Sequence, residues 1–129
     1  MEINIPDVVA EVEVAFLRYQ RAVDTNDVET MNALFWNSPF TVRFAPNGTL
    51  IGHEAIATYR QTRPASPAVR KLQNTVITTF GRDFAATNTE STKTGVRKVS
   101  RQSQAWFRTP QGWRIVAAHV SDQPEASQA

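Results

Sequence analysis

Two arginines, a tyrosine and a histidine in this sequence could together bind and process a small anion. Arg43 and Arg63 each present a planar guanidinium that can hold a carboxylate through two hydrogen bonds. Tyr19 could donate a proton, and His119 could exchange one near neutral pH because the pKa of a free imidazole is about 6.5. We therefore expect the arginines to bind a small carboxylated substrate while Tyr19 and His119 act as the catalytic acid and base. Structural roles remain open for both, Tyr19 as a core residue and His119 as a hydrogen-bonded one.

The most sheet-like part of the chain carries many polar groups. Residues 101–108 and 113–121 read as two strands joined by a turn at 109–112, and alternation assigns each side chain to one face. In the second strand one face is predicted to carry Trp113, Ile115, Ala117, His119 and Ser121. This face, small and apolar before a histidine, suits the floor and rim of a pocket. If the face shared by Gln104 and Trp106 is the inner one, the Gln104 amide could bind substrate; the alternative is a polar face buried against a partner subunit.

The composition excludes several other kinds of site. The 129 residues contain no cysteine, which rules out disulfides, thiolate nucleophiles and Cys-ligated zinc. With two histidines and no GxGxxG, Walker or GxSxG motif, we expect neither a metal nor a cofactor. A net charge of +2 is too small to indicate nucleic acid or a membrane surface as a partner. Three of the fourteen basic residues are lysines, and the eleven arginines favour carboxylate recognition.

The length and the hydropathy pattern indicate one domain in the cytoplasm. The stretch MEINIPDVV is acidic and lacks the apolar core of a signal peptide, and no run is long enough to span a membrane. We expect one domain over residues 1–129, in which residues 122–129 form a flexible tail.

Apolar periodicity predicts two helices near the N-terminus. Residues 4–27 carry one apolar stripe at spacings of three or four, with Asn4 as the expected N-cap. The stripe comprises Val8, Val12, Phe16, Tyr19 and Val23. A second helix within residues 25–36 is indicated by Asn26 and Glu29, which have the spacing of a capping box.

A third helix and two hairpins account for most of the remaining chain. The helix in HEAIATYRQTRP stops at Pro64 and carries Arg63 on the side of its apolar residues. One hairpin turns at Asn47-Gly48 and places Arg43 in mid-strand. A longer hairpin turns at residues 81–83 and leads into the strands described above.

The order of these elements indicates an α+β fold. Helix, helix, short hairpin and helix precede three or four long antiparallel strands. A long meander with helices on one face would curl into a half-open cone. We therefore expect a curved antiparallel sheet with the three helices of the N-terminal half packed on its concave face, and a substrate cavity between the two.

Seven segments of the chain resemble one protein family. They are FLRYQRAVDTND, LFW, TVRF, TRPAS, TVITTFGRDFAATNT, GVRKVSRQSQAWFRT and GWRIVAAHVS. Over residues 5–122 the sequence resembles the AtzH-like family, formerly a domain of unknown function, which includes proteins associated with oxalurate catabolism. This family lies within the SnoaL-like, nuclear-transport-factor-2-like superfamily, whose members have a cystatin-like fold.

The resemblance implies a small cytoplasmic hydrolase or an accessory catabolic protein. One branch of the family carries out decarboxylating hydrolysis of 1,3-dicarboxyurea to allophanate, and another is associated with amidases that act on oxalurate-like ureides. Tyr19, Arg43 and His119 lie in the matching segments and are the implied pocket residues, with Arg63 and Gln104 as additions. The resemblance also implies a homodimer formed through the open sheet and a functional association with an amidase.

Three functions remain open at this point. The leading hypothesis is a metal-free, decarboxylating amidohydrolase that acts on a dicarboxyurea- or oxalurate-type compound in nitrogen or ureide catabolism. The second is a non-catalytic ligand-binding or amidase-accessory protein, which would keep the arginines without needing a proton carrier. The third is a structural dimer module whose polar face is its interface and which binds no ligand.

Overall fold

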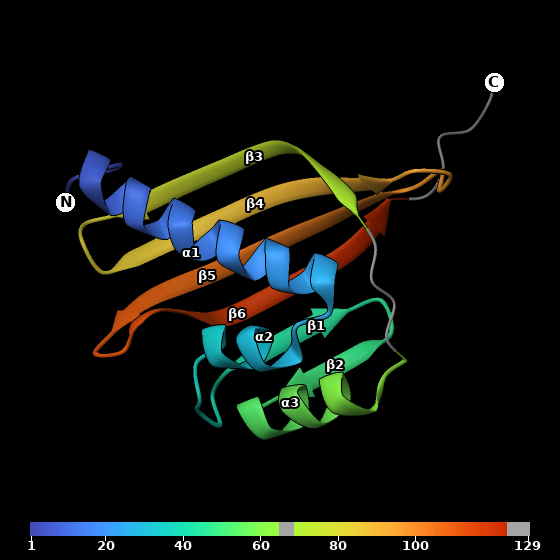
Figure 1. Ribbon diagram of the computed structural model, residues 1–129. Coiled ribbons are helices and arrows are strands. Elements are labelled where there is room, and N and C mark those ends of the chain that lie inside the picture. Colours follow the sequence, from blue (N-terminus) through green and yellow to red (C-terminus); the bar gives the residue numbers. More distant parts are fainter. Residues whose placement is uncertain (65–68, 124–129) are drawn as a thin grey trace.

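The computed structural model describes residues 1–64 and 69–123, which form three helices and one six-stranded sheet (Figure 1). The helices are α1 (Pro6–Thr25), α2 (Val28–Leu34) and α3 (His53–Thr62). The strands are β1 (Val42–Ala45), β2 (Gly48–Ile51), β3 (Arg70–Phe80), β4 (Phe84–Lys93), β5 (Val99–Thr109) and β6 (Gly112–Gln123). The predicted α+β cone is confirmed, since the helices pack on one face of a curved, mostly antiparallel sheet.

The strands of the described chain follow the order β2-β1-β6-β5-β4-β3. One edge of β6 pairs with β5 in antiparallel fashion, and the other edge runs parallel to β1. This parallel pair departs from the antiparallel sheet that we expected, because β1 reaches β6 through a long connection rather than a hairpin. The pair places Arg43 opposite Ala118, so these two side chains share one face of the sheet.

α1 lies across the inner face of the sheet (Figure 1), and four of the five residues of its predicted apolar stripe are buried, whereas the fifth, Val23, is half-buried. Its buried apolar residues are Val8, Val12, Phe16, Tyr19 and Ala22. The predicted N-cap is wrong, because Ile5 holds that position. Asn4 instead adopts a left-handed conformation (φ 58°), and its Oδ1 accepts from the backbone N–H of Thr79 at 2.9 Å. This contact fixes the N-terminal segment to β3.

The capping box predicted for α2 is also wrong by one residue. Asp27 is the N-cap, and its carboxylate accepts from the backbone N–H of Thr30 at 3.1 Å. Asn26 instead terminates α1 in a left-handed conformation (φ 54°), which asparagine tolerates better than most residues. Two polar residues in succession, Asn26 and Asp27, therefore divide between them the end of one helix and the start of the next.

The hydrophobic core fills the space between the helices and the inner face of the sheet. Its fully buried side chains include Phe35, Ile56, Trp106 and Ile115. Burial of each such side chain contributes roughly 1.5–3 kcal/mol relative to leaving it in water. This core holds α1 and α3 in place against the sheet and so fixes the positions of the residues that they carry.

A β-bulge in β6 reverses the faces predicted for the end of that strand. Trp106 pairs with Ile115 and the preceding Ala105 pairs with Ala117, so Val116 is one extra residue. Trp113 and Ile115 are buried, as alternation predicts, but beyond the bulge Ala118 is the buried residue. Ala117, His119 and Ser121 consequently lie on the outer face. The prediction that placed them on the face of Trp113 is wrong because alternation does not continue through a bulge.

The C-terminal strand continues further than expected. Asp122 and Gln123, the first two residues of the predicted tail 122–129, belong to β6, and Asp122 accepts from the Ser100 hydroxyl at 2.8 Å. Residues 124–129 and part of the predicted connector, residues 65–68, lie outside the described residues. Of the helices in the described ranges, none combines the length and hydropathy needed to cross a membrane.

Candidate functional site

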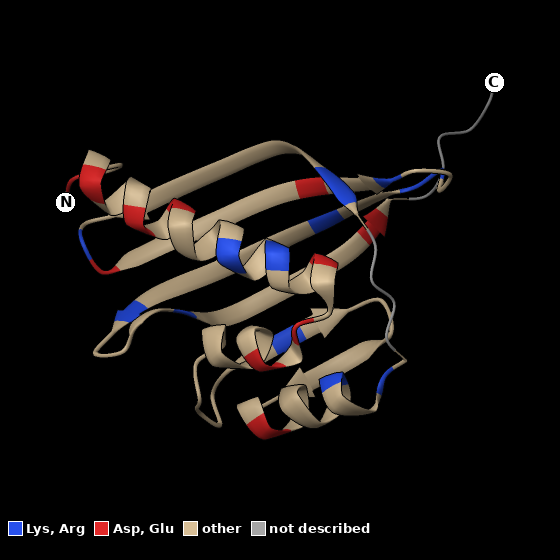
Figure 2. Cartoon of the chain, viewed as in Figure 1, with Lys and Arg blue, Asp and Glu red and all other residues tan. Residues whose placement is uncertain are grey.

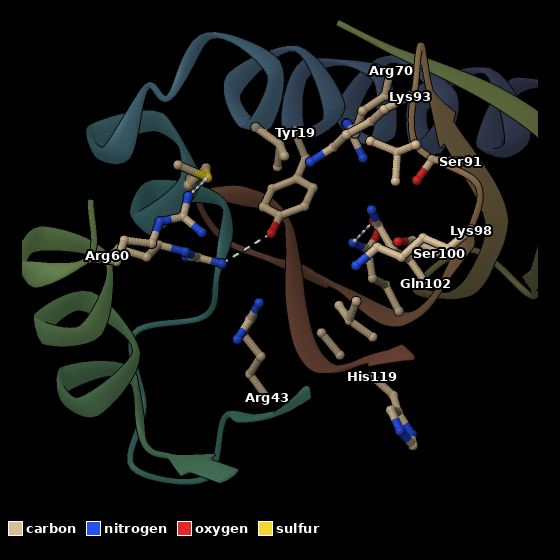
Figure 3. Close-up of a pocket in the computed structure, with 17 residues that line it drawn as sticks. Tyr19, Arg43, Arg60, Arg70, Ser91, Lys93, Lys98, Ser100, Gln102 and His119 are labelled. Carbon is tan, nitrogen blue, oxygen red and sulfur yellow. Dashed lines mark hydrogen bonds between the residues drawn. The ribbon is translucent and has the colours of Figure 1, made fainter. Parts of the chain in front are cut away.

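A cavity of about 180 Å³ opens between the C-terminal half of α1, the α3 region and the inner face of the sheet (Figure 3). α1 contributes Tyr19 and Val23, and α3 with its C-cap contributes Arg60 and Arg63. β1 contributes Arg43, and the inner faces of β4, β5 and β6 supply the remaining wall. The cavity thus lies where the fold class predicts it, between helices and concave sheet.

The lining of this cavity is strongly basic. Its cationic residues are Arg43, Arg60, Arg63, Arg70, Lys93 and Lys98. In the described part of the chain, no Asp or Glu lines the cavity. Figure 2 shows basic positions on α3, at the start of β3 and near the β4–β5 turn, and Arg60, Arg70 and Lys93 of these regions line the cavity. Such a single-sign lining attracts an anion and repels a cation.

Among the residues that the structure describes, two of the six cations have a carboxylate partner outside the cavity. Arg70 Nε lies 2.6 Å from Asp24 Oδ1, and Lys98 Nζ lies 3.3 Å from Asp122 Oδ2. The inner cations have contacts of a different kind, with neutral hydrogen-bond acceptors and aromatic rings. An anionic ligand would therefore bring to the inner end of the cavity a negative charge that the lining lacks.

Arg60 is the most deeply buried of these cations, with 3% of its surface exposed. Its Nη2 donates to the Tyr19 hydroxyl at 3.0 Å and its Nη1 donates to Asn32 Oδ1 at 3.2 Å, while the guanidinium stacks 4.3 Å from the Phe35 ring centroid. Burial lowers the pKa of Arg60, an effect opposed by Tyr19 and reinforced by the nearby arginines. A buried cation whose contacts are uncharged is costly, so this residue favours a bound anion.

Tyr19 and Arg60 both line the cavity, and Figure 3 shows the Tyr19 hydroxyl next to the Arg60 guanidinium. Only 6% of Tyr19 is exposed, and its ring packs 5.6 Å from that of Phe35. Because a guanidinium can only donate, the phenolic oxygen must accept from Arg60. The hydroxyl hydrogen of Tyr19 is then directed away from Arg60, and the cavity is the open side. Tyr19 is thereby placed to donate a hydrogen bond or a proton to a ligand.

Arg43 and Arg63 come from different elements and meet at one aromatic ring. The guanidinium carbons of Arg43 and Arg63 lie 5.6 Å and 6.0 Å from the ring centroid of Tyr59. Arg63 Nη2 also lies 3.5 Å from Asn26 Oδ1. The structure thus brings Arg43, Arg63 and Tyr19 to one cavity, which are three of the four residues that the sequence suggested would converge.

His119 does not join them. In the sheet His119 is paired with Phe44 on β1 and Ser103 on β5, on the outer face. Its exposed ring makes an edge contact with Phe44 at 6.1 Å between centroids. The residue borders the cavity, but Figure 3 shows its side chain pointing away from it. The expectation that the side chains of Arg43 and His119 point into one hollow is wrong, because the Val116 bulge turns His119 outward.

Gln104 lies on the inner face but its amide is occupied by the protein. Its Oε1 accepts from the Thr87 hydroxyl at 3.1 Å, and its Nε2 lies 3.4 Å from Gln102 Oε1. Gln102, nearer the open end of the same strand, is half-buried and also lines the cavity. Gln104 therefore positions Gln102 through a hydrogen bond, and it is not the direct ligand contact that the sequence suggested.

Sequence reasoning missed Arg60 and Gln102, as well as the cavity cations Arg70, Lys93 and Lys98. Arg60 follows the fully buried Ile56 by four residues on α3, a spacing that places both on the core side of the helix. That spacing could have identified Arg60 as a buried cation. Gln102 shares a face with Gln104 and Trp106, so the same alternation argument applied to it.

Comparison with known proteins supports a specific family. A search of curated proteins finds no match. A cystatin-like fold protein from Burkholderia xenovorans LB400 is 50% identical, with a TM-score of 0.90 over 95% of this chain and 96% of that one. A protein of unknown function of the DUF3225 family, from Pectobacterium atrosepticum SCRI1043, is 48% identical, with a TM-score of 0.91 over 94% of each chain.

A more distant solved structure places the same fold in a wider superfamily. A nuclear transport factor 2-like superfamily protein from Salmonella enterica serovar Typhimurium LT2 is 26% identical, with a TM-score of 0.73 over 95% of this chain and 94% of that one. The model of one family, described as AtzH-like, matches residues 1–126, which is nearly the whole sequence. Because this match covers almost the whole sequence, the chain belongs to the AtzH-like family.

Proposed function

We propose that this protein binds and hydrolyses a small carboxylated urea derivative, of dicarboxyurea or oxalurate type, and that a dicarboxyurea loses a carboxyl group in the process. The observation that carries the proposal is the basic cavity, in which Arg43, Arg60 and Arg63 surround the hydroxyl of a buried tyrosine. A volume of about 180 Å³ lies below the roughly 300–1,000 Å³ of pockets for drug-sized ligands, which favours a small substrate. Arginine pairs suit planar carboxylates because they can bind them bidentately.

The proposed reaction is the loss of a carboxyl group from nitrogen. In an N-carboxylated urea, the N–COO⁻ bond breaks, its electron pair goes to the nitrogen, and carbon dioxide leaves to be hydrated to bicarbonate. The nitrogen takes one proton, which Tyr19 supplies from its hydroxyl and regains from water. Arg60, 3.0 Å from that oxygen, would stabilise the negative charge left on it. A well-placed proton donor contributes about 10²–10⁴-fold to a rate.

Substrate consumption tests this proposal directly. Purified protein is given 1,3-dicarboxyurea carrying ¹³C in its carboxyl groups, and released bicarbonate is followed by NMR. Consumption of oxalurate, whose carboxyl group is bonded to carbon and not to nitrogen, is followed by the loss of its own signals. We expect consumption by the natural sequence and loss of both binding and turnover in Arg43→Gln. The matched control is Arg82→Gln, because Arg82 is exposed, pairs with the exposed Asp7 and does not line the cavity. If no compound of this class is bound or consumed, the proposal is wrong.

A second candidate function is binding without catalysis, as a ligand-binding or amidase-accessory protein. The observation that favours it is the outward position of His119, which removes one of the two expected proton carriers from the cavity. Thermal shift measurements with carboxylated ureas, followed by an assay of their consumption, separate the two candidates. A carboxylated urea that raises the melting temperature but is never consumed supports binding alone.

We infer further that the outer face of the sheet is covered by a second copy of the chain. Phe44, Val76, Phe84 and Phe107 on this face are between 40% and 54% exposed, far more than a monomer needs to show in one place. Between them lies an apolar groove of about 340 Å³ that includes Val42, Ala86, Ala105 and Ala117. A self-complementary sheet face of this kind suits a two-fold dimer. The cavity opens on the opposite face and would stay accessible.

A further inference from the structure

The hydrogen bonds in the polar wall of the cavity determine which way each side-chain amide is oriented. Two chains of hydrogen bonds run through buried side chains and meet at a single atom, Gln102 Oε1. Each chain starts at a group that can only donate, which fixes the orientation of every amide that follows it.

The first chain begins at the indole of Trp106. The Trp106 Nε1–H donates to Thr87 Oγ1 at 2.9 Å, so that oxygen is an acceptor. The Thr87 hydroxyl hydrogen then goes to Gln104 Oε1 at 3.1 Å. This orients the Gln104 amide so that its Nε2 faces Gln102 Oε1 at 3.4 Å. Trp106, Thr87 and Gln104 are all at most 5% exposed, so water does not compete for these bonds.

The second chain begins at Arg70, whose position is fixed by Asp24. Arg70 Nη2 donates to Gln20 Oε1 at 2.8 Å, which orients the Gln20 amide. Gln20 Nε2 then donates to Gln102 Oε1 at 3.0 Å. Gln20 is 3% exposed and lies on α1, so this chain also joins the helix to β5.

Both series of hydrogen bonds therefore end at Gln102 Oε1, and they leave the Nε2 group of the Gln102 amide available. Within the described residues, the hydrogen bonds of the Gln102 side chain all use Oε1. Since Gln102 lines the cavity, its Nε2 is left as a donor on the cavity side. The Tyr19 hydroxyl is oriented in the same way by Arg60.

We propose that Gln102 is a specificity-determining residue whose amide N–H groups read a hydrogen-bond acceptor on the ligand. The inference rests on the proposed function, because it assumes that a small anion occupies the cavity. The residue would favour a carboxylate or carbonyl oxygen at its position and disfavour an amide NH₂, which would place donor against donor. The network thus distinguishes a dicarboxylate from its mono-amide, beyond the charge selection made by the arginines.

The test compares two ligands and two matched substitutions. Malonate and malonamate differ in one end, carboxylate against amide, and their affinities are measured by isothermal titration calorimetry. Gln102→Glu replaces the donor by an acceptor while its carboxylate can still accept from Gln20 and Gln104. Gln111→Glu is the control, since it makes the same chemical change at an exposed residue of the β5–β6 turn.

We expect Gln102→Glu to lower the preference for malonate over malonamate by about tenfold or more, the effect of losing one charge-assisted hydrogen bond and gaining repulsion. Gln111→Glu should change this ratio by less than about twofold, because its charge is remote and screened. An equal change in the two variants, or none, overturns the role of Gln102 and leaves the proposed function standing. If the natural sequence binds neither ligand, the role of Gln102 is overturned, whereas the proposed function is decided separately by the binding and consumption of the carboxylated ureas.

A measurement on the natural sequence covers the case in which Gln102→Glu does not fold. The side-chain NH₂ signals of the glutamines are followed by ¹⁵N NMR during a malonate titration, with the Gln102 pair assigned from Gln102→Met. We expect the Gln102 pair to shift more than those of Gln20 and Gln104, whose amides are already engaged. Unchanged Gln102 signals at saturating malonate would overturn the proposal.

Discussion

The Arg60 guanidinium donates to the hydroxyl of Tyr19 at 3.0 Å, within the wall of a cavity that has no acidic residue among its described lining. One contact therefore links the deepest cation of the site to its best placed proton donor. α3 supplies the first residue and α1 the second, so the pair depends on how the two helices pack on the sheet. We expect substitution of Arg60 to affect anion binding and substitution of Tyr19 to affect turnover.

Replacing Arg60 by methionine should separate the stability of the empty protein from its ability to bind an anion. Arg60 is buried among uncharged partners, so exchanging it for an apolar side chain of similar length should cost the empty protein little. We expect the melting temperature without ligand to fall by no more than a few degrees or to rise. The increase caused by saturating malonate should be lost. A variant that melts far lower but still gains the full stabilisation from malonate would contradict this view of Arg60.

Replacing Tyr19 by phenylalanine should slow turnover far more than it weakens binding. The ring and its packing against Phe35 remain, but the proton donor is removed and one N–H of Arg60 loses its acceptor. We expect kcat to fall by about 10²–10⁴, and the free energy of unfolding to fall by about 1–3 kcal/mol. Steady-state kinetics on the dicarboxyurea substrate and urea unfolding measure the two effects. His119→Ala is the contrast: because that side chain points away from the cavity, its kcat should stay within about twofold.

The sequence was sufficient for the residues whose positions depend on local periodicity. The stripe that contains Tyr19 is set by the repeat of α1, and Arg43 lies on the first strand of the predicted hairpin, although the hairpin turns at Pro46-Asn47 rather than at the predicted Asn47-Gly48. Both side chains reach the cavity because a helix face and a strand face are determined by neighbouring residues. The same reasoning predicted that Arg63 lies at the end of α3, where the structure places it.

Features that depend on non-local pairing could not be predicted. The bulge at Val116 arises where β5 and β6 adjust their register around buried Trp106 and Ile115, and one extra residue inverts every side chain beyond it. His119 was misplaced for this reason alone. The parallel pairing of β1 with β6 joins segments far apart in the chain, and no local pattern in either strand specifies it. The direction of the Gln102 amide likewise depends on Trp106 and Arg70 acting from different elements.

Low pH should weaken the hydrogen bonds by which Glu90 on β4 joins β3 and β5. Its carboxylate accepts from Arg101, Asn74 and Gln73, and the bond from Arg101 is the largest reason why the pKa of Glu90 falls to about 2 from its ordinary 4.5. A carboxyl whose folded-state pKa is lowered contributes stability above its unfolded pKa and loses that contribution as the pH falls through the folded value.

The expected result follows from that sign. Glu90→Gln should be less stable than the natural sequence at pH 7, and the difference should shrink as the pH is lowered from about 4.5 to about 2. Urea unfolding followed by tryptophan fluorescence at several pH values measures it. Because the group is at the surface, added salt should reduce the difference as well. A difference that stays constant between pH 7 and pH 2.5 would exclude an ionised Glu90 as the cause.

A charge placed in the middle of the outer sheet face should separate the proposed dimer without closing the cavity. Ala117 lies opposite Ala105 in the groove of this face, with its side chain directed away from the inner wall. Ala117→Arg would bring two guanidinium groups into the apolar centre of a two-fold interface, where an unpaired charge is strongly unfavourable. We expect light scattering after gel filtration to give twice the 14.4 kDa chain mass for the natural sequence and the single mass for the variant. Ala10→Arg, the same change on the exposed side of α1, should remain dimeric.

Malonate affinity should be similar in all three proteins, because the ligand enters from the opposite face of the sheet. A natural sequence that is monomeric at the concentrations used would show that the outer face serves some other purpose.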